Sequence, residues 1–310
     1  MSAPGPVVVG LGLHRPMQPK ELEGIAHHKP IQHDPDDVVP TAVVDGIQGL
    51  VARRVAEAPF SIAVGVVELH QYAGVSGGHK AVSVGCGGRS TIAQLHSRSR
   101  VLQSGVGIGI IDGNPFRAAV EALGRAAGCR LALVWVPATG EWLFGTPEAV
   151  VREGLSRIQP WSFVSNRAPG VVLKVPQSKA CSLYQASRAA TYLSESPSPA
   201  IEEGGTIVIE ASCPEGLGAE AGFIHALRGC APPWRALLSG PEPTGAGAQR
   251  AVMLVRLAER FHLQVEGCAN PEPLLEVGII ARREVESRPP TWLVVDDPFQ
   301  RLPQCVDPLQ

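Results

Sequence analysis

The sequence lacks the features by which several classes of protein are recognised. It has no long basic run, its net charge is −2 and only 18% of its residues are charged, so neither a nucleic-acid-binding face nor a basic membrane-binding face is expected. No apolar stretch approaches the ~18 residues that span a bilayer. The N-terminus shows no basic start followed by a long apolar run, so a secretory signal is not expected either.

Paired cysteines are also missing. The seven cysteines are scattered and include no C-x-x-C pair, which disfavours a zinc knuckle or a disulfide framework. We therefore expect a cytoplasmic protein, because a reducing compartment keeps such thiols unpaired. The chain has 310 residues, of which 45% are hydrophobic, and this is enough apolar material for a packed core.

What the sequence does contain is an alternation of short β-rich runs and helical patterns. We predict strands at 6–13, 59–69, 130–137, 206–212, 262–267 and 291–297, and helices at 19–28, 89–99, 114–128, 182–193, 219–230 and 247–261. This alternation predicts an α/β fold with mostly parallel sheets. Because Asn166, Pro169, Gly170 and Pro176 interrupt the pattern, we expect two α/β domains, 1–175 and 176–310, with an active-site cleft between them. The proline-rich end (Pro298, Pro303, Pro308) is expected to be an irregular tail.

Histidines are concentrated in the first third of the chain. Seven of the nine lie between residues 14 and 96, and such clustering points to metal or acid–base chemistry. His27, His28 and His33 match no known ligand spacing, so we interpret them as a solvated helix end and turn. We assign no role to His79.

The most informative segment is VVELHQYAGVSGGHKAVSVGCGGRSTIAQLH, residues 66–96. A predicted strand ends at His70, a glycine-rich turn and Lys80 follow, and His96 lies on the next helix. Ligands of α/β sheets bind beyond the carboxyl ends of the strands. Gly77 and Gly78 would let backbone N–H groups cradle a phosphate, and Lys80 would be either a phosphate contact or a covalent anchor. Cys86 is interpreted as a small packing residue.

These residues resemble the nickel-pincer lactate racemase family. The resemblance rests on GLHRP (12–16), on the pattern H-x3-G-x-S-G-G-x-K (70–80) and on His96, sixteen residues after Lys80. Further matches along most of the chain are QHDPDD (32–37), GNPFRAAVEAL (113–123), LYQASR (183–188) and GGTIVIEASCPEGLG (204–218). GVGIGIIDGNP (105–115) lacks the G-x-G-x-x-G spacing and gives only weak support to a dinucleotide site.

The resemblance implies a cofactor and the residues that hold it. Lys80 would carry a pyridinium-3-thioamide-5-thiocarboxylic acid mononucleotide, the nickel-pincer nucleotide, through a covalent link. Ser76, Gly77 and Gly78 would bind this cofactor, and His96 would be the protein's ligand to nickel. Separate cofactor maturation enzymes are implied as partners.

The resemblance also implies the reaction, which is racemisation or epimerisation of a small 2-hydroxy acid. Because the Cα proton of such an acid has a very high pKa, the family moves that hydrogen as hydride, to and from the cofactor. His14 and His70 would be the acid–base pair. Each would act as base in one direction and as acid in the other, which suits groups that titrate near neutral pH.

Arg15, Gln185 and Arg188 are the residues implied in substrate binding. Arg188 stands where the family has a lysine, and arginine offers a bidentate fork for a carboxylate but donates no proton. The family carries a D-x-x-R-type segment before GLHRP, whereas this sequence begins thirteen residues before His14. We therefore expect a short form of the family, with the identity of the 2-hydroxy acid left open.

Two alternatives remain at this point. The same cofactor scaffold would also serve a larger hydroxy acid or another alcohol. A non-enzymatic paralogue would bind the cofactor without turnover, although it would need only Lys80 and His96, and the intact His14 and His70 count against it. Whether the chain forms a homo-oligomer is left open.

Overall fold

The computed structural model describes residues 6–230, 236–245 and 247–306, and the contacts within the chain divide it into two compact units. Unit 1 contains the described residues up to Glu68, together with Tyr72–Val106 and Ile110–Ile158. Unit 2 contains Leu69–Gln71, Gly107–Gly109 and the described residues from Gln159 onward. The expected domains, 1–175 and 176–310, stay a prediction.

The main sheet of unit 1 consists of β5 (Ser61–Val66), β8 (Cys129–Val136) and β9 (Glu141–Gly145), with β5 and β8 parallel and β9 antiparallel to β8. Helix α5 (Pro115–Ala126) precedes β8 and is the predicted helix at 114–128. Its first turn is fixed by sequence, because the Asn114 side chain accepts a hydrogen bond from the Arg117 N–H and proline occupies the first helical position. Helix α6 (Pro147–Ile158) packs on β8.

A β-hairpin in unit 1 was not predicted. Strands β3 (Val38–Val44) and β4 (Ile47–Ala52) pair antiparallel. Asp45 and Gly46 join them with φ of 50° and 76°, which are the left-handed angles that a tight hairpin turn needs. The pair Asp-Gly between two apolar runs was the available signal.

The remaining elements of unit 1 are short. They are β1 (Val8–Val9), the 3-10 helix η1 (Pro19–His28), β2 (Ile31–Gln32), α1 (Arg53–Ala56), β7 (Gly74–Val75), α2 (Lys80–Ser83), α3 (Arg89–Leu95) and α4 (Arg98–Val101). The predicted strand at 6–13 is reduced to two residues because the chain turns at 11–14, where the His14 N–H donates to the Leu11 carbonyl. The predicted helix at 89–99 is broken after Leu95.

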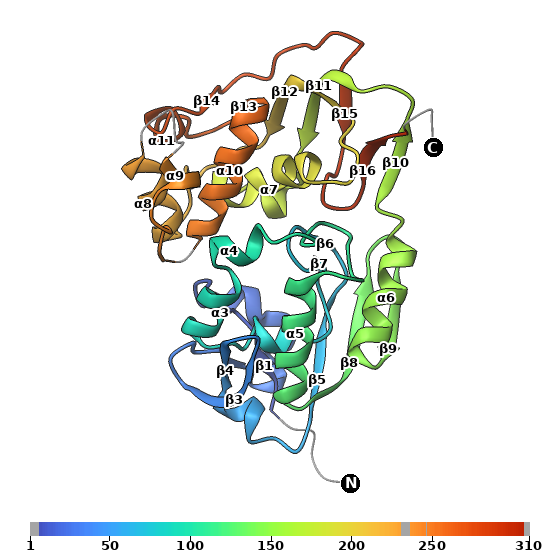
Figure 1. Ribbon diagram of the computed structural model, residues 1–310, viewed down its shortest axis with the longest axis vertical. Helices are drawn as coiled ribbons and strands as arrows, with labels where there is room; N and C mark the ends of the chain where they lie inside the picture. The colour runs from blue at the N-terminus through green and yellow to red at the C-terminus, as the bar shows by residue number, and fades with distance from the viewer. Residues whose placement is uncertain (1–5, 231–235, 246, 307–310) are drawn as a thin grey trace. The chain divides into compact units, whose positions relative to one another are not determined.

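Unit 2 is built on a five-stranded, fully parallel sheet with the order β14-β13-β12-β11-β15. The strands are β11 (Ala168–Lys174), β12 (Ile201–Glu210), β13 (His262–Glu266), β14 (Ile280–Ala281) and β15 (Leu293–Val295). Helices α7 (Leu183–Ser194) and α10 (Ala248–Arg260) lie side by side and pack on this sheet (Figure 1). Both helices were predicted from their apolar spacing.

The other elements of unit 2 are η2 (Gln177–Lys179), α8 (Ala221–Gly229), α9 (Ala236–Ser239), α11 (Glu272–Glu276), and the strands β6 (Leu69–His70), β10 (Trp161–Val164) and β16 (Leu302–Cys305). The prediction of an irregular tail is wrong for Pro303, which lies in β16, parallel to β10. Leu302 and Pro303 are buried, so apolar packing stabilises this strand. Among the described strands β16 pairs with β10 alone, and proline is tolerated in such an edge strand. Pro308 lies outside the described residues.

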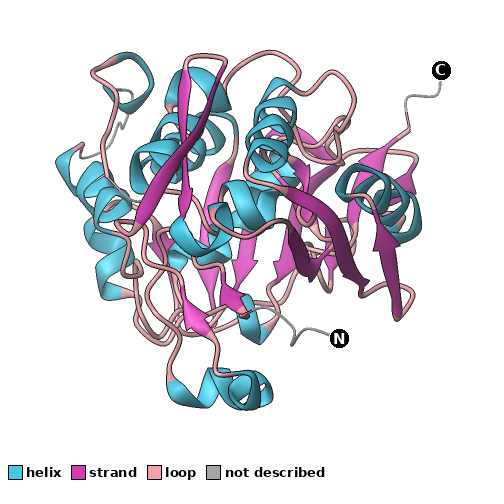
Figure 2. Ribbon diagram, turned by 90° about the horizontal axis from the view of Figure 1, so that it is seen from below, coloured by secondary structure: helices cyan, strands magenta, loops and turns pink. Residues whose placement is uncertain are grey.

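Helices and strands are mixed through both units, as Figure 2 shows, so the predicted α/β class with mostly parallel sheets is confirmed. Within the described part of the chain, no helix combines the length and the apolar character needed to cross a membrane.

Candidate active site

The loop that follows β5 is closed by the side chain of Ser76. Its Oγ donates to the Val66 carbonyl at 2.7 Å and accepts from the Glu68 N–H at 3.0 Å, and its own N–H donates to the Glu68 carbonyl at 2.8 Å. These bonds fold the loop back onto the end of its strand. The hydroxyl of Ser76 therefore has a structural use, and its contact with a cofactor stays a prediction.

Two buried polar residues of α5 hold the same loop from the other side. Asn114 Nδ2 donates to the carbonyls of Tyr72 (2.8 Å) and Ile110 (2.9 Å). Arg117 is 1% exposed, donates from Nη1 to the Val75 carbonyl at 3.1 Å and pairs with Glu121 at 2.7 Å. Both residues lie in GNPFRAAVEAL (113–123), but no role was predicted for them from the sequence. The signal was present, since Asn114 precedes a helix and the arginine has a glutamate four residues later.

Gly77 and Gly78 are required by the backbone itself. Their φ angles are +85° and +59°, a region that favours glycine. A Cβ on Gly78 would also lie 2.8 Å from Val151 Cγ2 and 2.9 Å from the Pro147 carbonyl oxygen. Packing therefore explains these glycines without a ligand, and the phosphate cradle predicted from them stays a prediction.

Lys80 is half-buried and begins α2, directly after the buried His79. His79 Nε2 lies 2.9 Å from Glu148 Oε1, which also accepts from Arg125 at 2.6 Å. Burial lowers the pKa of His79, against the opposing effect of Glu148. Burial alone would raise the pKa of Glu148, but its bonds to the backbone, Arg125 and His79 lower it to about 2. His79 thus ties the start of α2 to α6 through Glu148, and it fixes the residue next to the candidate anchor.

His96 caps the C-terminus of α3 and is half-buried. Its Nδ1 lies 2.9 Å from the Ile92 carbonyl oxygen, and its ring packs edge-on against Tyr72 and Phe116, with centroids 5.8 and 5.3 Å away. Since a carbonyl only accepts, Nδ1 carries a proton, and in the neutral ring Nε2 is the nitrogen that has the lone pair. Histidine ligands of metals are commonly oriented in this way, by a second hydrogen bond to a backbone carbonyl.

The GLHRP segment joins the same region of unit 1. Gly12 donates its N–H to the Gly85 carbonyl at 2.8 Å, just after α2. His14 and Arg15 are exposed. Arg15 forms a bidentate pair with Glu21 at 2.8 and 3.0 Å, and this pair, with a backbone bond from Gln18, lowers the pKa of Glu21 to about 2. Any carboxylate that binds Arg15 must compete with Glu21.

The interpretation of His33 as a solvated residue is wrong. His33 is 6% exposed and its Nε2 lies 2.9 Å from the Gly87 carbonyl oxygen, and burial lowers its pKa. This contact fastens the QHDPDD segment to the glycines after α2. His27 and His28 are exposed, as expected. Cys86 is buried, and burial raises the pKa of its thiol to about 11, which agrees with a packing residue.

The other predicted site residues belong to unit 2. His70 is the half-buried last residue of β6. Gln185 and Arg188 lie on one face of α7, and Arg188 donates to Gln185 Oε1 at 3.3 Å and to the Tyr192 hydroxyl at 2.8 Å. The Arg188 guanidinium also lies 5.5 Å from the ring centroid of Phe299, an arrangement that stabilises a cation. Unit 1 holds Lys80, His96, His14 and Arg15.

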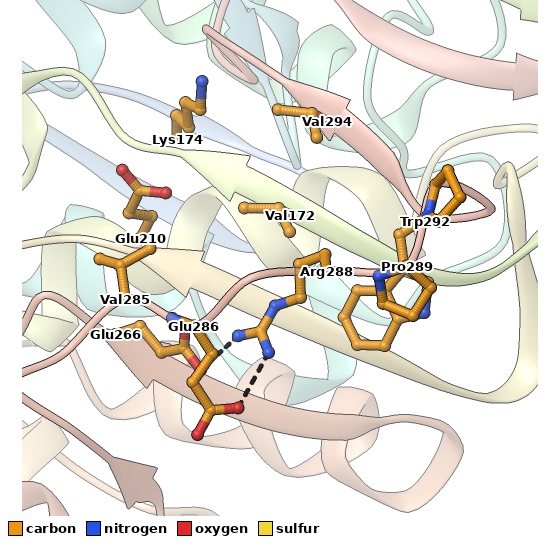
Figure 3. A pocket seen from close by; sticks show the side chains of 11 residues that line it. Val172, Lys174, Glu210, Glu266, Val285, Glu286, Arg288, Pro289, Trp292 and Val294 are labelled. Carbon is orange, nitrogen blue, oxygen red and sulfur yellow. Dashed lines mark hydrogen bonds and ion pairs between the residues drawn. The ribbon is translucent and has the colours of Figure 1, made fainter.

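A hollow of about 460 Å³ lies elsewhere in unit 2 and involves none of the predicted site residues. Figure 3 shows Arg288 extended toward Glu286 and Glu266, to which ion pairs join it, beside Trp292 and the strands β11 and β15. Arg288 also lies 5.2 Å from the Trp292 ring centroid. These contacts fasten the segment before β15 to the sheet. Among the described residues, no group of three or more His, Cys, Asp or Glu side chains is arranged to hold a metal ion.

The chain is similar to known proteins of the lactate racemase type in part of its sequence and in its fold. Residues 6–107 match the family model described as the lactate racemase N-terminal domain. No curated protein matches the chain. Among solved structures, the chain is similar to the lactate racemase apoprotein from Thermoanaerobacterium thermosaccharolyticum, with a TM-score of 0.82 and 18% identity over 96% of this chain and 78% of that one.

A second similar structure is that of a protein from Thermotoga maritima, with a TM-score of 0.70 and 13% identity over 96% of this chain and 85% of that one. At such identities the likeness establishes the fold alone. The resemblance carried by residues 66–96 is therefore confirmed: residues 6–107 match the lactate racemase N-terminal domain, and the chain has the fold of the lactate racemase apoprotein.

Proposed function

We propose that this protein is a racemase or epimerase of a small 2-hydroxy acid that uses a nickel-pincer nucleotide linked to Lys80. The observation that carries the proposal is the hydrogen bond between His96 Nδ1 and the Ile92 carbonyl, because it leaves Nε2 as the metal-binding nitrogen. The match of residues 6–107 to a lactate racemase domain supports the same reaction class.

The residues present fit this cofactor. A pincer nucleotide supplies most of the donor atoms to its nickel, so a single histidine is what the protein would add, and His96 is held in the required tautomer. Lys80 would hold the nucleotide covalently, from a helix start that His79 and Glu148 fix in place. When bound, the cofactor would accept the substrate's Cα hydrogen as hydride and return it. Maturation enzymes that make and load the cofactor would be partners of the chain.

The chain's own residues would move the proton and hold the substrate. His14 and His70 would take the proton from the substrate's hydroxyl oxygen on one face and give one back on the other, so that each serves as base in one direction and acid in the other. Arg15 and Arg188 would each donate a hydrogen bond to the carboxylate, and Gln185 would donate a neutral hydrogen bond. Arg15 would first have to exchange Glu21 for the substrate.

The decisive experiment is an intact-mass measurement with a nickel assay on protein purified from cells that contain the maturation enzymes. We expect a mass increment localised to Lys80 and about one nickel per chain. Lys80→Ala should lose both, whereas Lys20→Ala, a change of an exposed lysine in the same unit, should lose neither. A Lys80→Ala protein that still carries nickel and nucleotide would contradict the covalent assignment.

Substitutions of the three histidines should distinguish residues needed for cofactor and nickel binding from residues needed for turnover. His96→Ala should keep the mass increment and lose most of the nickel. His14→Gln and His70→Gln should keep both and lose racemisation by about 10²–10⁴-fold, the usual contribution of general acid–base catalysis. Loaded protein that turns over none of a panel of 2-hydroxy acids, larger sugar acids and other alcohols would favour a non-enzymatic cofactor carrier.

A further inference from the structure

Gln71, directly after His70, is a buried amide whose orientation is fixed. It is 3% exposed, and its Oε1 accepts from the Thr191 hydroxyl at 3.0 Å and from Arg250 Nη1 at 3.5 Å. Two donors on one atom identify that atom as the oxygen, so the Nε2 group is held as a donor. Within the described part of the chain, Nε2 has no hydrogen-bond partner.

Arg250 is a buried cation that pairs with no carboxylate of the described residues. It is 7% exposed, its guanidinium lies 5.1 Å from the ring centroid of Tyr184, and its polar contact within the described part of the chain is a long one to Gln71, at 3.5 Å. No carboxylate pairs with it and its Nε has no hydrogen-bond partner among the described residues. A desolvated charge is unfavourable unless an opposite charge compensates it, so the surroundings of Arg250 favour the binding of an anion.

Both orphan donors lie against the face of α7 that carries the predicted substrate residues. Tyr184, Arg188 and Thr191 are four and three residues apart, a spacing that places them on one face of a helix. Arg250 contacts the first of these and Gln71 contacts the last. The donors therefore border Arg188 within unit 2, and every residue involved belongs to that unit.

We propose that Gln71 and Arg250 form a carboxylate-binding subsite, in which Gln71 Nε2 and the Arg250 guanidinium bind the carboxylate of the hydroxy acid. The subsite rests on the proposed function, since the hydroxy acid is the substrate named there. The subsite would bind an oxyanion. Phosphate is also an oxyanion and could bind in place of the carboxylate, so the test includes both. The subsite adds a specificity-determining pair to Arg188: Gln71 occupies a variable position of the pattern at 70–80, and Arg250 lies on α10.

The test uses apoprotein, so that its outcome does not depend on the cofactor. Binding of sodium lactate and of sodium phosphate is titrated by calorimetry for the wild type and for three variants. Arg250→Gln removes the cation. Gln71→Glu places a carboxylate beside Arg250 as a built-in occupant. Arg256→Gln is the matched control, because Arg256 lies on the same helix but is 37% exposed and pairs with Glu195.

We expect Arg250→Gln and Gln71→Glu to weaken lactate binding by about tenfold or more, the effect of losing one charge-assisted contact, and Arg256→Gln to leave it unchanged. Gln71→Glu should also raise the melting temperature, so it remains informative if Arg250→Gln fails to fold. Wild-type affinity for lactate in Gln71→Glu would overturn the proposal. So would phosphate binding that depends on Arg250 while lactate binding does not, or the absence of any wild-type binding up to about 100 mM. Lactate binding by the wild type, together with no turnover of 2-hydroxy acids by cofactor-loaded protein, would count against the proposed function instead.

Discussion

Two buried arginines, one in each unit, have opposite electrostatic surroundings. Arg117 in unit 1 donates from Nε to Glu121 Oε1 at 2.7 Å and from Nη1 to the Val75 carbonyl at 3.1 Å. Arg250 in unit 2 has an aromatic ring, one long contact to an amide, and no carboxylate among the described residues. The first charge is compensated inside the protein and serves the structure. The second is compensated by nothing described, which is the state expected of a group that binds a ligand.

The difference between the two arginines is tested most directly by removing each charge in turn and measuring the loss of stability. Arg117→Gln should lower the free energy of unfolding by about 3–5 kcal/mol, because it breaks an ion pair whose arginine is buried and leaves Glu121, which is 17% exposed, with only the longer pair to Arg125 at 3.8 Å. Arg250→Gln should cost only about 1 kcal/mol, the loss of a cation–π contact offset by removal of an uncompensated charge. Urea unfolding monitored separately for each unit by hydrogen exchange measures both. Equal costs would show that the two arginines have the same role.

Lowering the pH should reduce the stability of unit 1 more than that of unit 2, by less than the difference expected between the two arginine substitutions. In unit 1 the pKa values of His79 and His33 are lowered from 6.5 by burial, so the folded state disfavours the protonated form. Their contribution to stability is complete above pH 6.5 and is lost as the pH falls from there toward the folded-state pKa. We expect the free energy of opening of unit 1, obtained from hydrogen-exchange rates corrected for the intrinsic pH dependence of amide exchange, to fall between pH 7 and 5.5 more than that of unit 2.

His79→Gln should reduce this pH dependence by about half, since His33 keeps its own share, and the amide would preserve a donor to Glu148. His225→Gln, at an exposed position of unit 2, is the control and should leave the profile of unit 1 as it is. A steep acid response that survives in His79→Gln would assign the effect to other groups.

The smallest effect concerns Arg15, whose exposed pair with Glu21 contrasts with the buried Arg250. Glu21→Gln should leave stability nearly unchanged, because exposed ion pairs contribute little. If Arg15 binds the substrate carboxylate, the same change should lower KM by removing its competitor, with kcat unaltered. Asp36→Asn breaks an equally exposed bidentate pair with Arg89 and should not change KM. A KM that is identical in both variants would remove Arg15 from the substrate site.

Much of the fold was readable from local sequence. Helix α5 follows from Asn114, Pro115 and the spacing of its apolar residues, and α7 and α10 follow from the same periodicity. Strand β16 was missed because three prolines argued for a tail, and only its burial beside β10 made it a strand. The hairpin β3–β4 was missed although its Asp-Gly turn was visible.

The candidate site divides in the same way. Lys80, His96 and the glycine turn were predicted from the family resemblance and their functional roles stay predictions, whereas the burial of His33, the contacts of Asn114 and the meeting of Gln71 with Arg250 were not predicted. His33 looks like a turn residue until Gly87, 54 positions away, approaches its ring.

The sequence by itself determined the elements that depend on near neighbours along the chain: capped helices, left-handed glycines, and the pairing of Arg117 with a glutamate one helical turn later. Only the tertiary structure decided which polar groups are desolvated and what faces them. Gln71 and Arg250 are 179 positions apart, and no local pattern in either segment indicates that they meet. The reason is that burial is a property of how distant segments pack, and burial sets whether an arginine is a solvated surface charge or a cation in need of an anion.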